Sequence, residues 1–198
     1  MAVHASDPPT SAVATPVRFT FDDYVRYTEE HAGDFELRDG VIVAMAPEGD
    51  AHMLTRNTLD RYLHRTLDPA RYSAFTESSF PCLGWAEGPR PNNFVARGAL
   101  LDEGRRPVAA DIALIIEIAS DEARLKDDRN KTETYASVGV PEYWIVDLLH
   151  RSVLVHREPQ GINYTFIETR RPGETITAVA VDALTIAVDL LLRRARSS

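Results

Sequence analysis

The feature that most constrains the fold is a run from Asp111 to Asp147, DIALIIEIASDEARLKDDRNKTETYASVGVPEYWIVD. It opens with a continuous apolar segment, which is typical of a strand covered on both faces. A helix is expected from about Arg124 to Val138, and Gly139 is suited to end it. The chain then resumes an apolar strand at Tyr143. This order of strand, helix and strand predicts an α/β fold.

One carboxylate, Glu117, lies inside the first apolar segment, between Ile116 and Ile118. An ionised carboxylate buried without a partner costs on the order of several kcal/mol. Lys131 and Tyr135 are four residues apart on the following helix, so they share one of its faces. We therefore expect Glu117 to be partnered either by a metal or by a buried ion pair with Lys131 or an arginine.

Length and composition indicate one globular domain, since the chain has 198 residues and a 44% apolar fraction. Residues 1–17 mix Ala, Pro, Ser and Thr without periodicity, so we expect a disordered tail followed by a single domain over residues 18–198. The formal charge of -8 argues against a broad cationic surface for nucleic acid, although a local basic patch stays open. The single cysteine, Cys82, excludes an internal disulfide and favours a cytoplasmic location. No segment has the roughly 18 consecutive apolar residues of a membrane span.

Turn and cap residues divide the rest of the chain into short elements. Thr20 predicts a capped helix that ends at Gly33, and Asp39-Gly40 between two apolar runs predicts a hairpin with a type I′ turn. A second helix is expected over about Ala51–Leu67, started by Asp50. Further strands are expected over Tyr72–Phe80, Asn93–Arg97, Ser152–Arg157, Asn163–Thr169 and Ile176–Val181, before a short C-terminal helix. Several strands follow one another through short turns, so we predict a mixed sheet, antiparallel in part and flanked by helices.

The outer face of the second helix carries Arg56, Arg61, His64 and Arg65. Such a face is either solvated or directed at phosphate groups, and solvation is the usual case.

Polar side chains stand at three places where sheets usually hold apolar ones. Glu36 lies in the first hairpin strand, Asn92 and Asn93 begin a strand after Pro91, and Glu117 lies in the long apolar strand. Carboxylate and amide oxygens that converge on one point are what Mg²⁺ requires, and a nearby lysine can position or deprotonate water. The pattern indicates metal-assisted phosphodiester hydrolysis. The alternatives are an exposed hairpin glutamate at position 36 and an ordinary loop residue at position 92.

Four segments make the chain resemble the Uma family, a bacterial branch of the PD-(D/E)XK nuclease superfamily. They are FELRDGVIV, RPNNFVA, ALIIEIAS and KDDRNKTETYASVGVPEYWIVD. The resemblance covers roughly Phe19 to Leu192, and GVPEYWIVD is its most specific part. It implies a restriction-endonuclease-like fold, dependence on Mg²⁺ or Mn²⁺, a homodimer, and an endonuclease that acts on DNA.

The resemblance also implies roles for individual residues. Glu36 matches the family's hairpin glutamate, and Glu117 matches its central metal-binding acid. Lys131 resembles a lysine that has moved onto the helix, because the usual lysine position two residues after the acid is Ala119 here. Glu36, Glu117 and Lys131 are thus the expected catalytic residues. Further pocket positions matched by the family are His52, Asp127 and Tyr135.

The chain departs from the family pattern at two places. The family's Pro-Asp pair is Pro91-Asn92 here, and a neutral amide should weaken Mg²⁺ binding although its oxygen can still be a ligand. The stretch after Glu117, commonly Ser-Pro-Ser-Thr, adds two acids here, Asp121 and Glu122, near the expected phosphate path. Glu77, on a neighbouring strand, is a candidate to compensate for Asn92. The expected metal ligands are Glu36, Glu77, Asn92 and Glu117.

Two main functions stay open from the sequence. The first is a homodimeric, metal-dependent endonuclease that hydrolyses DNA and is weakened by Asn92. The second is a catalytically degenerate nuclease fold that acts as a dimerisation or partner-binding module. A phosphate-containing small molecule as substrate is a third interpretation, suggested by the acidic surface.

Overall fold

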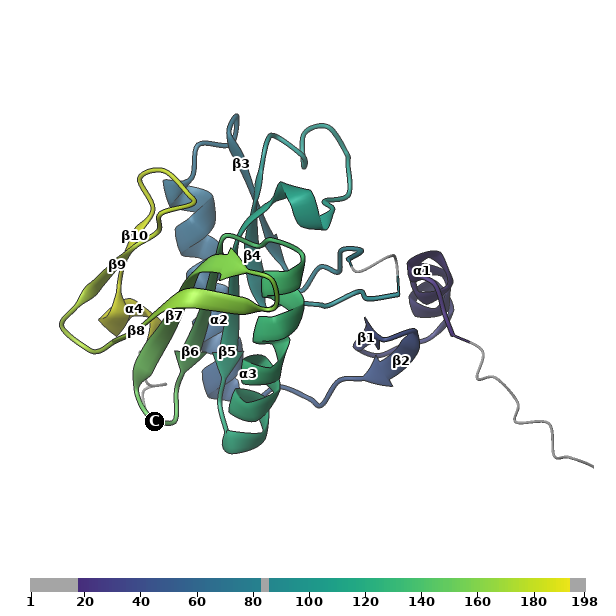
Figure 1. The fold of residues 1–198 in the computed structure, drawn as a ribbon, viewed down its shortest axis with the longest axis horizontal. Coiled ribbons are helices and arrows are strands. Elements are labelled where there is room, and N and C mark those ends of the chain that lie inside the picture. Colours follow the sequence, from purple (N-terminus) through teal and green to yellow (C-terminus); the bar gives the residue numbers. More distant parts are fainter. Residues whose placement is uncertain (1–17, 83–85, 193–198) are drawn as a thin grey trace, which may run out of the picture.

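The computed structural model describes residues 18–82 and 86–192, and its centre is a mixed sheet of six strands in the order β3-β4-β5-β6-β7-β8 (Figure 1). Only β5 and β6 run parallel among these neighbours. The sheet strands are β3 Tyr72–Thr76, β4 Asn93–Arg97, β5 Ile112–Ala119, β6 Glu142–Asp147, β7 Ser152–Gln160 and β8 Asn163–Arg170. This mixed sheet with flanking helices confirms the predicted fold class. The expected tail over residues 1–17 lies outside the described residues.

The predicted strand, helix and strand form the middle of the molecule. Every residue of β5 is buried, and α3 (Glu122–Ser137) connects it to the parallel strand β6, with Glu117 beside Ile145. α3 begins at Glu122, two residues before the predicted Arg124, because the carboxylate of Asp121 accepts a hydrogen bond from the Arg124 backbone N–H at 3.0 Å. Asp121 is therefore an N-cap.

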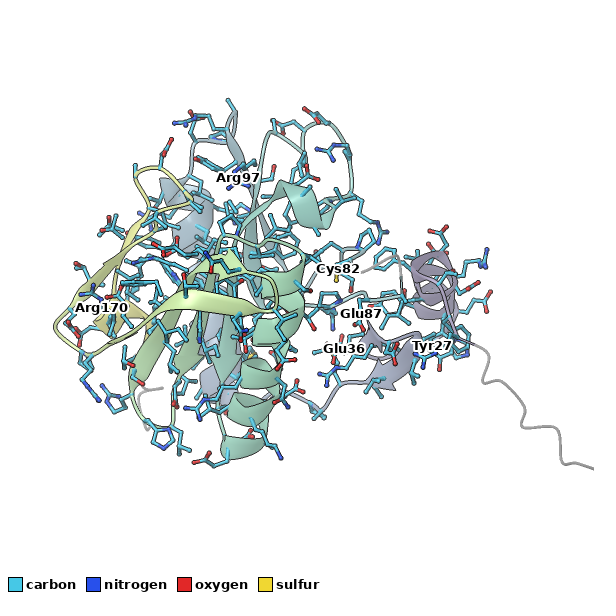
Figure 2. All side chains as sticks on the ribbon, in the orientation of Figure 1. Tyr27, Glu36, Cys82, Glu87, Arg97 and Arg170 are labelled. Atoms are coloured by element: carbon cyan, nitrogen blue, oxygen red, sulfur yellow. The ribbon has the colours of Figure 1, made fainter. Side chains whose placement is uncertain are left out.

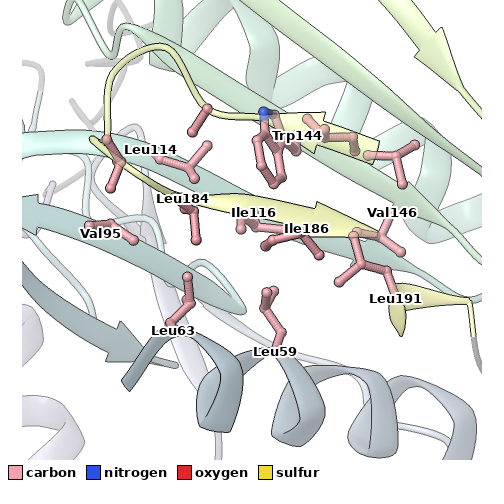
Figure 3. Packing of buried hydrophobic residues seen from close by; sticks show 14 of the residues in the cluster. Leu59, Leu63, Val95, Leu114, Ile116, Trp144, Val146, Leu184, Ile186 and Leu191 are labelled. Atoms are coloured by element: carbon pink, nitrogen blue, oxygen red, sulfur yellow. The ribbon is translucent and has the colours of Figure 1, made fainter. Parts of the chain in front are cut away.

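The two faces of the sheet are covered by different elements. On one face, α2 (Asp50–Thr66) and the C-terminal segment pack against the strands (Figure 3). Labelled members of this core are Leu59, Leu63, Val95, Leu114, Ile116, Trp144, Val146, Leu184, Ile186 and Leu191. On the other face, α3 packs Leu125, Tyr135 and Ala136 against Ile115 and Tyr143. The alternating side chains of β5 thus serve two cores, and this explains its continuous apolar sequence.

The N-terminal elements form a small unit beside the main sheet (Figure 1). It consists of α1 (Phe21–Glu30), β1 (Phe35–Arg38) and β2 (Val41–Ala44), with Phe21, Tyr24 and Leu37 buried between them. The hairpin joins residues 86–88, because Leu37 and Gly88 exchange backbone hydrogen bonds of 3.1 and 2.8 Å. Gly88 is required there, since a Cβ atom would lie 2.8 Å from the Phe21 ring.

Both local signals in this unit are confirmed. Thr20 and Asp23 form a reciprocal capping box, and Asp39 and Gly40 have φ angles of 45° and 71°, as a type I′ turn requires. The helix ends at Glu30, before the predicted Gly33, where His31 adopts an extended backbone.

Two boundaries in the middle of the chain differ from the prediction. β3 ends at Thr76 and does not reach Phe80, because Glu77 has a φ angle of 46° and turns the chain out of the sheet. α2 starts at Asp50, so its N-cap is Gly49 and no side chain caps its first turn.

The C-terminal segment is a hairpin in place of the single strand predicted over Ile176–Val181. It pairs β9 (Thr175–Thr177) with β10 (Thr185–Ala187), and α4 (Val188–Leu191) follows. β9 is short because the backbone N–H groups of Val179 and Ala180 donate to the carboxylate of Glu142, at 2.8 and 3.2 Å. Among the described residues, no helix combines the length and apolar character needed to cross a membrane.

Glu142 ties this hairpin to the main sheet. Its side chain has no exposed surface, and it also accepts hydrogen bonds from Trp144 Nε1 at 2.9 Å and Arg157 Nε at 2.8 Å. Loss of the carboxylate would therefore leave several buried donors without an acceptor.

We expect Glu142→Ala to lower the free energy of unfolding by about 3–5 kcal/mol, the range for removing one partner of a buried charged pair. Urea denaturation followed by tryptophan fluorescence measures this change. Glu133→Ala, at an exposed position of α3, is the control and should stay within about 0.5 kcal/mol of the native protein. A loss below about 1 kcal/mol for Glu142→Ala would contradict the assigned role.

Candidate functional site

The carboxylate of Glu117 is buried, and both of its oxygens accept hydrogen bonds. Its Oε1 atom accepts from Lys131 Nζ at 2.9 Å and from the Tyr135 hydroxyl at 3.1 Å, and its Oε2 atom accepts from the Asn92 backbone N–H at 3.0 Å. The side chain is 3% exposed. The partner that the sequence requires is thus present as an ion pair with Lys131.

Lys131 is surrounded by acids. Besides Glu117, its ammonium group lies 3.6 Å from Asp127 Oδ2 and 3.5 Å from Asp128 Oδ1. Burial acts to lower the pKa of Lys131, but the carboxylates of Glu117 and Asp128 outweigh it and hold that pKa above its usual value. Burial beside Glu117 likewise raises the pKa of the Tyr135 hydroxyl. Lys131 is therefore a cation and a hydrogen-bond donor in this site.

Glu36 is also buried, at 2% exposure, so it is not the exposed hairpin residue that was the alternative. Oε1 forms an ion pair with Arg38, whereas Oε2 is buried without a hydrogen-bond partner among the described residues. Burial raises the pKa of Glu36, and the charges of Lys131 and Arg38 oppose that shift. An acid with one unpaired buried oxygen has room for a further positive partner.

A pocket of about 190 Å³ opens between the hairpin and α3. One side is lined by Glu36, Leu37 and Arg38 of β1 together with Glu87 and Pro89 of the segment that the hairpin joins. The other side is lined by Asp127, Asn130, Lys131, Thr134 and Tyr135 of α3. In Figure 2, Glu36 and Glu87 appear between the hairpin and the main sheet. Four of the residues predicted for the site therefore share one pocket: Glu36, Asp127, Lys131 and Tyr135. Glu117 does not line it but is hydrogen-bonded to Lys131.

Asn92 bridges β4 and β5 in both directions. Its backbone N–H donates to Glu117, and its side-chain oxygen accepts from the Ile118 backbone N–H at 2.8 Å. The amide oxygen expected to be a metal ligand is thus already engaged with the backbone. The residue is more than a loop position, because it fixes the Glu117 carboxylate and completes the edge of the strand.

Glu77 and His52 belong to a second cluster beside Asn92. Glu77 pairs with Arg56 and lies 3.7 Å from Arg90, and its pKa is raised by burial and by neighbouring Glu48. His52 has no exposed surface, and its Nδ1 atom lies 3.1 Å from Glu48. Burial lowers the pKa of the His52 imidazole. Neither residue is among those that line the pocket between the hairpin and α3, although the charge of Glu117 acts to raise the pKa of His52.

The basic residues of α2 lie in two environments, one inside this cluster and one outside it. Arg56 is directed inward, since it pairs with both Glu48 and Glu77. His64 contacts Asp60 of its own helix, because its Nδ1 atom lies 3.0 Å from the Asp60 carbonyl oxygen and 3.4 Å from the Asp60 carboxylate. Arg61 and Arg65 form no ion pair within residues 18–82 and 86–192, which agrees with the solvated alternative for that end of the helix.

Two residues of the site, Arg38 and Asp128, were not predicted from the sequence. Arg38 is two residues from Glu36, so the repeat of a strand places both on the same face of β1. Asp128 is three residues before Lys131, so the repeat of a helix places both on the same face of α3. Arg38 donates to both carboxylate oxygens of Asp127, at 2.7 and 2.6 Å. Asp128 is buried, and burial with the charge of Glu117 raises its pKa.

Comparisons with known proteins place this geometry in context. A crystal structure from Anabaena variabilis ATCC 29413, described as "a putative nuclease belonging to DUF820", superposes with a TM-score of 0.62 at 17% sequence identity. The match covers 89% of this chain and 98% of that chain, and at this identity it shows a shared fold. Among curated proteins, none matches the sequence.

The family comparison covers nearly the whole described chain. The model of the family Uma2, described as "Putative restriction endonuclease", matches residues 21–189, which include the hairpin, β5 and α3. The chain belongs to the Uma2 family and has its nuclease-like fold.

Proposed function

We propose that this protein is a divalent-metal-dependent endonuclease that hydrolyses DNA phosphodiester bonds and is weakened by asparagine at position 92. The observation that carries the proposal is the convergence of Glu117, Lys131 and Glu36 around one pocket in a chain of a nuclease family. The family resemblance further implies a homodimer.

The side chains present fit a hard cation, with a reduced charge. Glu36 offers a buried oxygen without a partner, Glu117 offers a second carboxylate, and Asn92 offers an amide oxygen that also accepts from Ile118. Among the described residues, no group of three or more His, Cys, Asp or Glu side chains is arranged to hold a metal. Two carboxylates and an amide should therefore bind Mg²⁺ or Mn²⁺ less tightly than three carboxylates.

Glu36 and Glu117 would hold the cation, which when bound supplies Lewis-acid polarisation of a phosphoryl oxygen. Lys131 contributes a positive charge that favours the anionic phosphate and the developing charge on the leaving oxygen. Tyr135 and the Asn92 backbone orient the Glu117 carboxylate from two sides. The raised pKa of Lys131 means that it acts here as a donor and a charge, not as a general base.

A degenerate, partner-binding module is the second candidate, and two observations favour it. The Asn92 side-chain oxygen is taken by Ile118, and both candidate acids already have protein cations, Arg38 at Glu36 and Lys131 at Glu117. Asp121, one of the two acids near the expected phosphate path, does not distinguish the two candidates, because its carboxylate caps α3.

Replacement of Glu117 tests the metal site. We expect Glu117→Gln to weaken Mn²⁺ binding by about tenfold or more, the equivalent of one strong charged ligand, in titrations followed by electron paramagnetic resonance. Glu77→Gln is the matched control: it removes one carboxylate near Asn92 but not from the pocket, so affinity should be unchanged. Equal affinity in the native protein and Glu117→Gln would reject Glu117 as a ligand.

Restoring the acid at position 92 tests the proposed weakening. We expect Asn92→Asp to bind Mn²⁺ about tenfold more tightly, a gain of about 1.4 kcal/mol. The attraction of an added charge about 4 Å away is larger, about 4 kcal/mol near a protein surface, but the cost of desolvating the carboxylate offsets part of it. The variant should also nick supercoiled plasmid DNA faster than the native chain, as measured on agarose gels. The double variant Asn92→Asp/Glu117→Gln is the control for contaminating nuclease. The endonuclease proposal fails if neither the native chain nor Asn92→Asp binds a divalent cation or nicks DNA.

A further inference from the structure

The pocket lies at the junction of two separately packed parts of the molecule. The N-terminal unit has its own small core of Phe21, Tyr24 and Leu37, whereas α3 packs on the main sheet. Glu36 is carried by the first part, and Glu117 with Lys131 by the second. Any cation shared by Glu36 and Glu117 therefore depends on what holds the hairpin against α3.

Arg38 provides that connection and contacts a candidate ligand at the same time. Its guanidinium donates two parallel hydrogen bonds to Asp127 on α3, at 2.7 and 2.6 Å, and forms an ion pair with Glu36. The Arg38 side chain is 42% exposed, whereas that of Glu36 is 2% exposed. The guanidinium thus occupies the open side of a buried acid and covers one of its two oxygens.

We propose that Arg38 is an internal competitor for the divalent cation at Glu36, and that Asp127 holds Arg38 when the cation displaces it. This inference rests on the proposed metal site and adds a residue that sets its affinity. Arg38 is a positioning residue in this scheme, because it acts through Glu36.

The geometry explains why displacement is feasible. A guanidinium has five N–H donors in a rigid fork, so the two bonds to Asp127 can persist when the contact with Glu36 is lost. Arg38 then stays paired, and the hairpin stays attached to α3. Without Asp127, Glu36 would be the remaining carboxylate in contact with the guanidinium among the described residues, and the cation would meet stronger competition.

The competition predicts opposite effects for the two partners of one ion pair. We expect Arg38→Gln to raise Mn²⁺ affinity about threefold to fivefold, the fold-change that corresponds to a partly exposed ion pair. Asp127→Asn should lower the affinity. A purely structural latch would behave otherwise, because loss of either partner would loosen the hairpin and weaken binding in both variants.

Two variants provide matched controls in the same titration. Glu87→Gln removes one acid from the lining of the same pocket, so Asp127→Asn must lower the affinity more than Glu87→Gln does. Arg124→Gln removes a different link to α3, since Arg124 donates to the carbonyls of Ala46 and Pro47 at 2.9 and 3.0 Å, and should leave Mn²⁺ affinity unchanged. Thermal denaturation of each variant shows whether it is folded.

A measurement on the native chain covers the case in which Arg38→Gln does not fold. In NMR spectra of ¹⁵N-labelled arginine side chains, Mg²⁺ should shift the Arg38 signal and leave that of Arg124 unchanged. The inference is overturned if native protein binds Mn²⁺ through Glu117 while Arg38→Gln binds equally or less tightly, or if Mg²⁺ leaves the Arg38 signal unchanged. That result would leave the proposed function standing. Failure of every variant, including Asn92→Asp, to bind a divalent cation would reject both.

Discussion

The buried ion pair between Glu117 and Lys131 is the interaction on which the rest of the molecule depends. It joins the central strand to α3. Removal of either Glu117 or Lys131 would leave the other charge buried without this partner, at a cost on the order of 3–5 kcal/mol. Its position fixes α3, and α3 in turn presents Asp127 to Arg38. The hairpin that carries Glu36 is thereby held where Glu36 meets the same pocket. One pair of charges therefore positions both halves of the candidate site.

The parts of the fold that sequence predicted well are those with a local cause. The Asp39-Gly40 turn needs positive φ angles that few residues adopt, and β5 needs apolar side chains on both faces. The errors have non-local causes. β3 ends just before Glu77, which takes a left-handed backbone and pairs with Arg56 and Arg90 from other segments. The C-terminal hairpin is shaped by Glu142, more than thirty residues away in sequence. Neither effect leaves a mark in the periodicity of the affected strand.

The same distinction holds for the candidate site. A carboxylate in an apolar strand predicts that a partner exists, and the spacing of Lys131 and Tyr135 predicts which helix face supplies it. Which acid each arginine pairs with could not be predicted from spacing. Arg56 turns toward Glu48 and Glu77 whereas Arg38 turns toward Glu36, and these choices depend on which strand ends are neighbours in space. Glu77 looked available to replace a missing aspartate from the sequence, yet in three dimensions it already has two cationic partners.

Asn92 has a structural role that does not depend on a metal. The side-chain oxygen that accepts from Ile118 is a structural contact, and asparagine or aspartate can each make it with one oxygen. The second side-chain atom differs: aspartate would present another anionic oxygen, whereas asparagine presents an NH₂ donor, which repels a cation. Asparagine at this position thus provides the link between β4 and β5 without the negative charge that aspartate would add. Arg38 and Lys131 offset part of the negative charge of Glu36 and Glu117, so each of these buried acids has a protein cation beside it even without a metal.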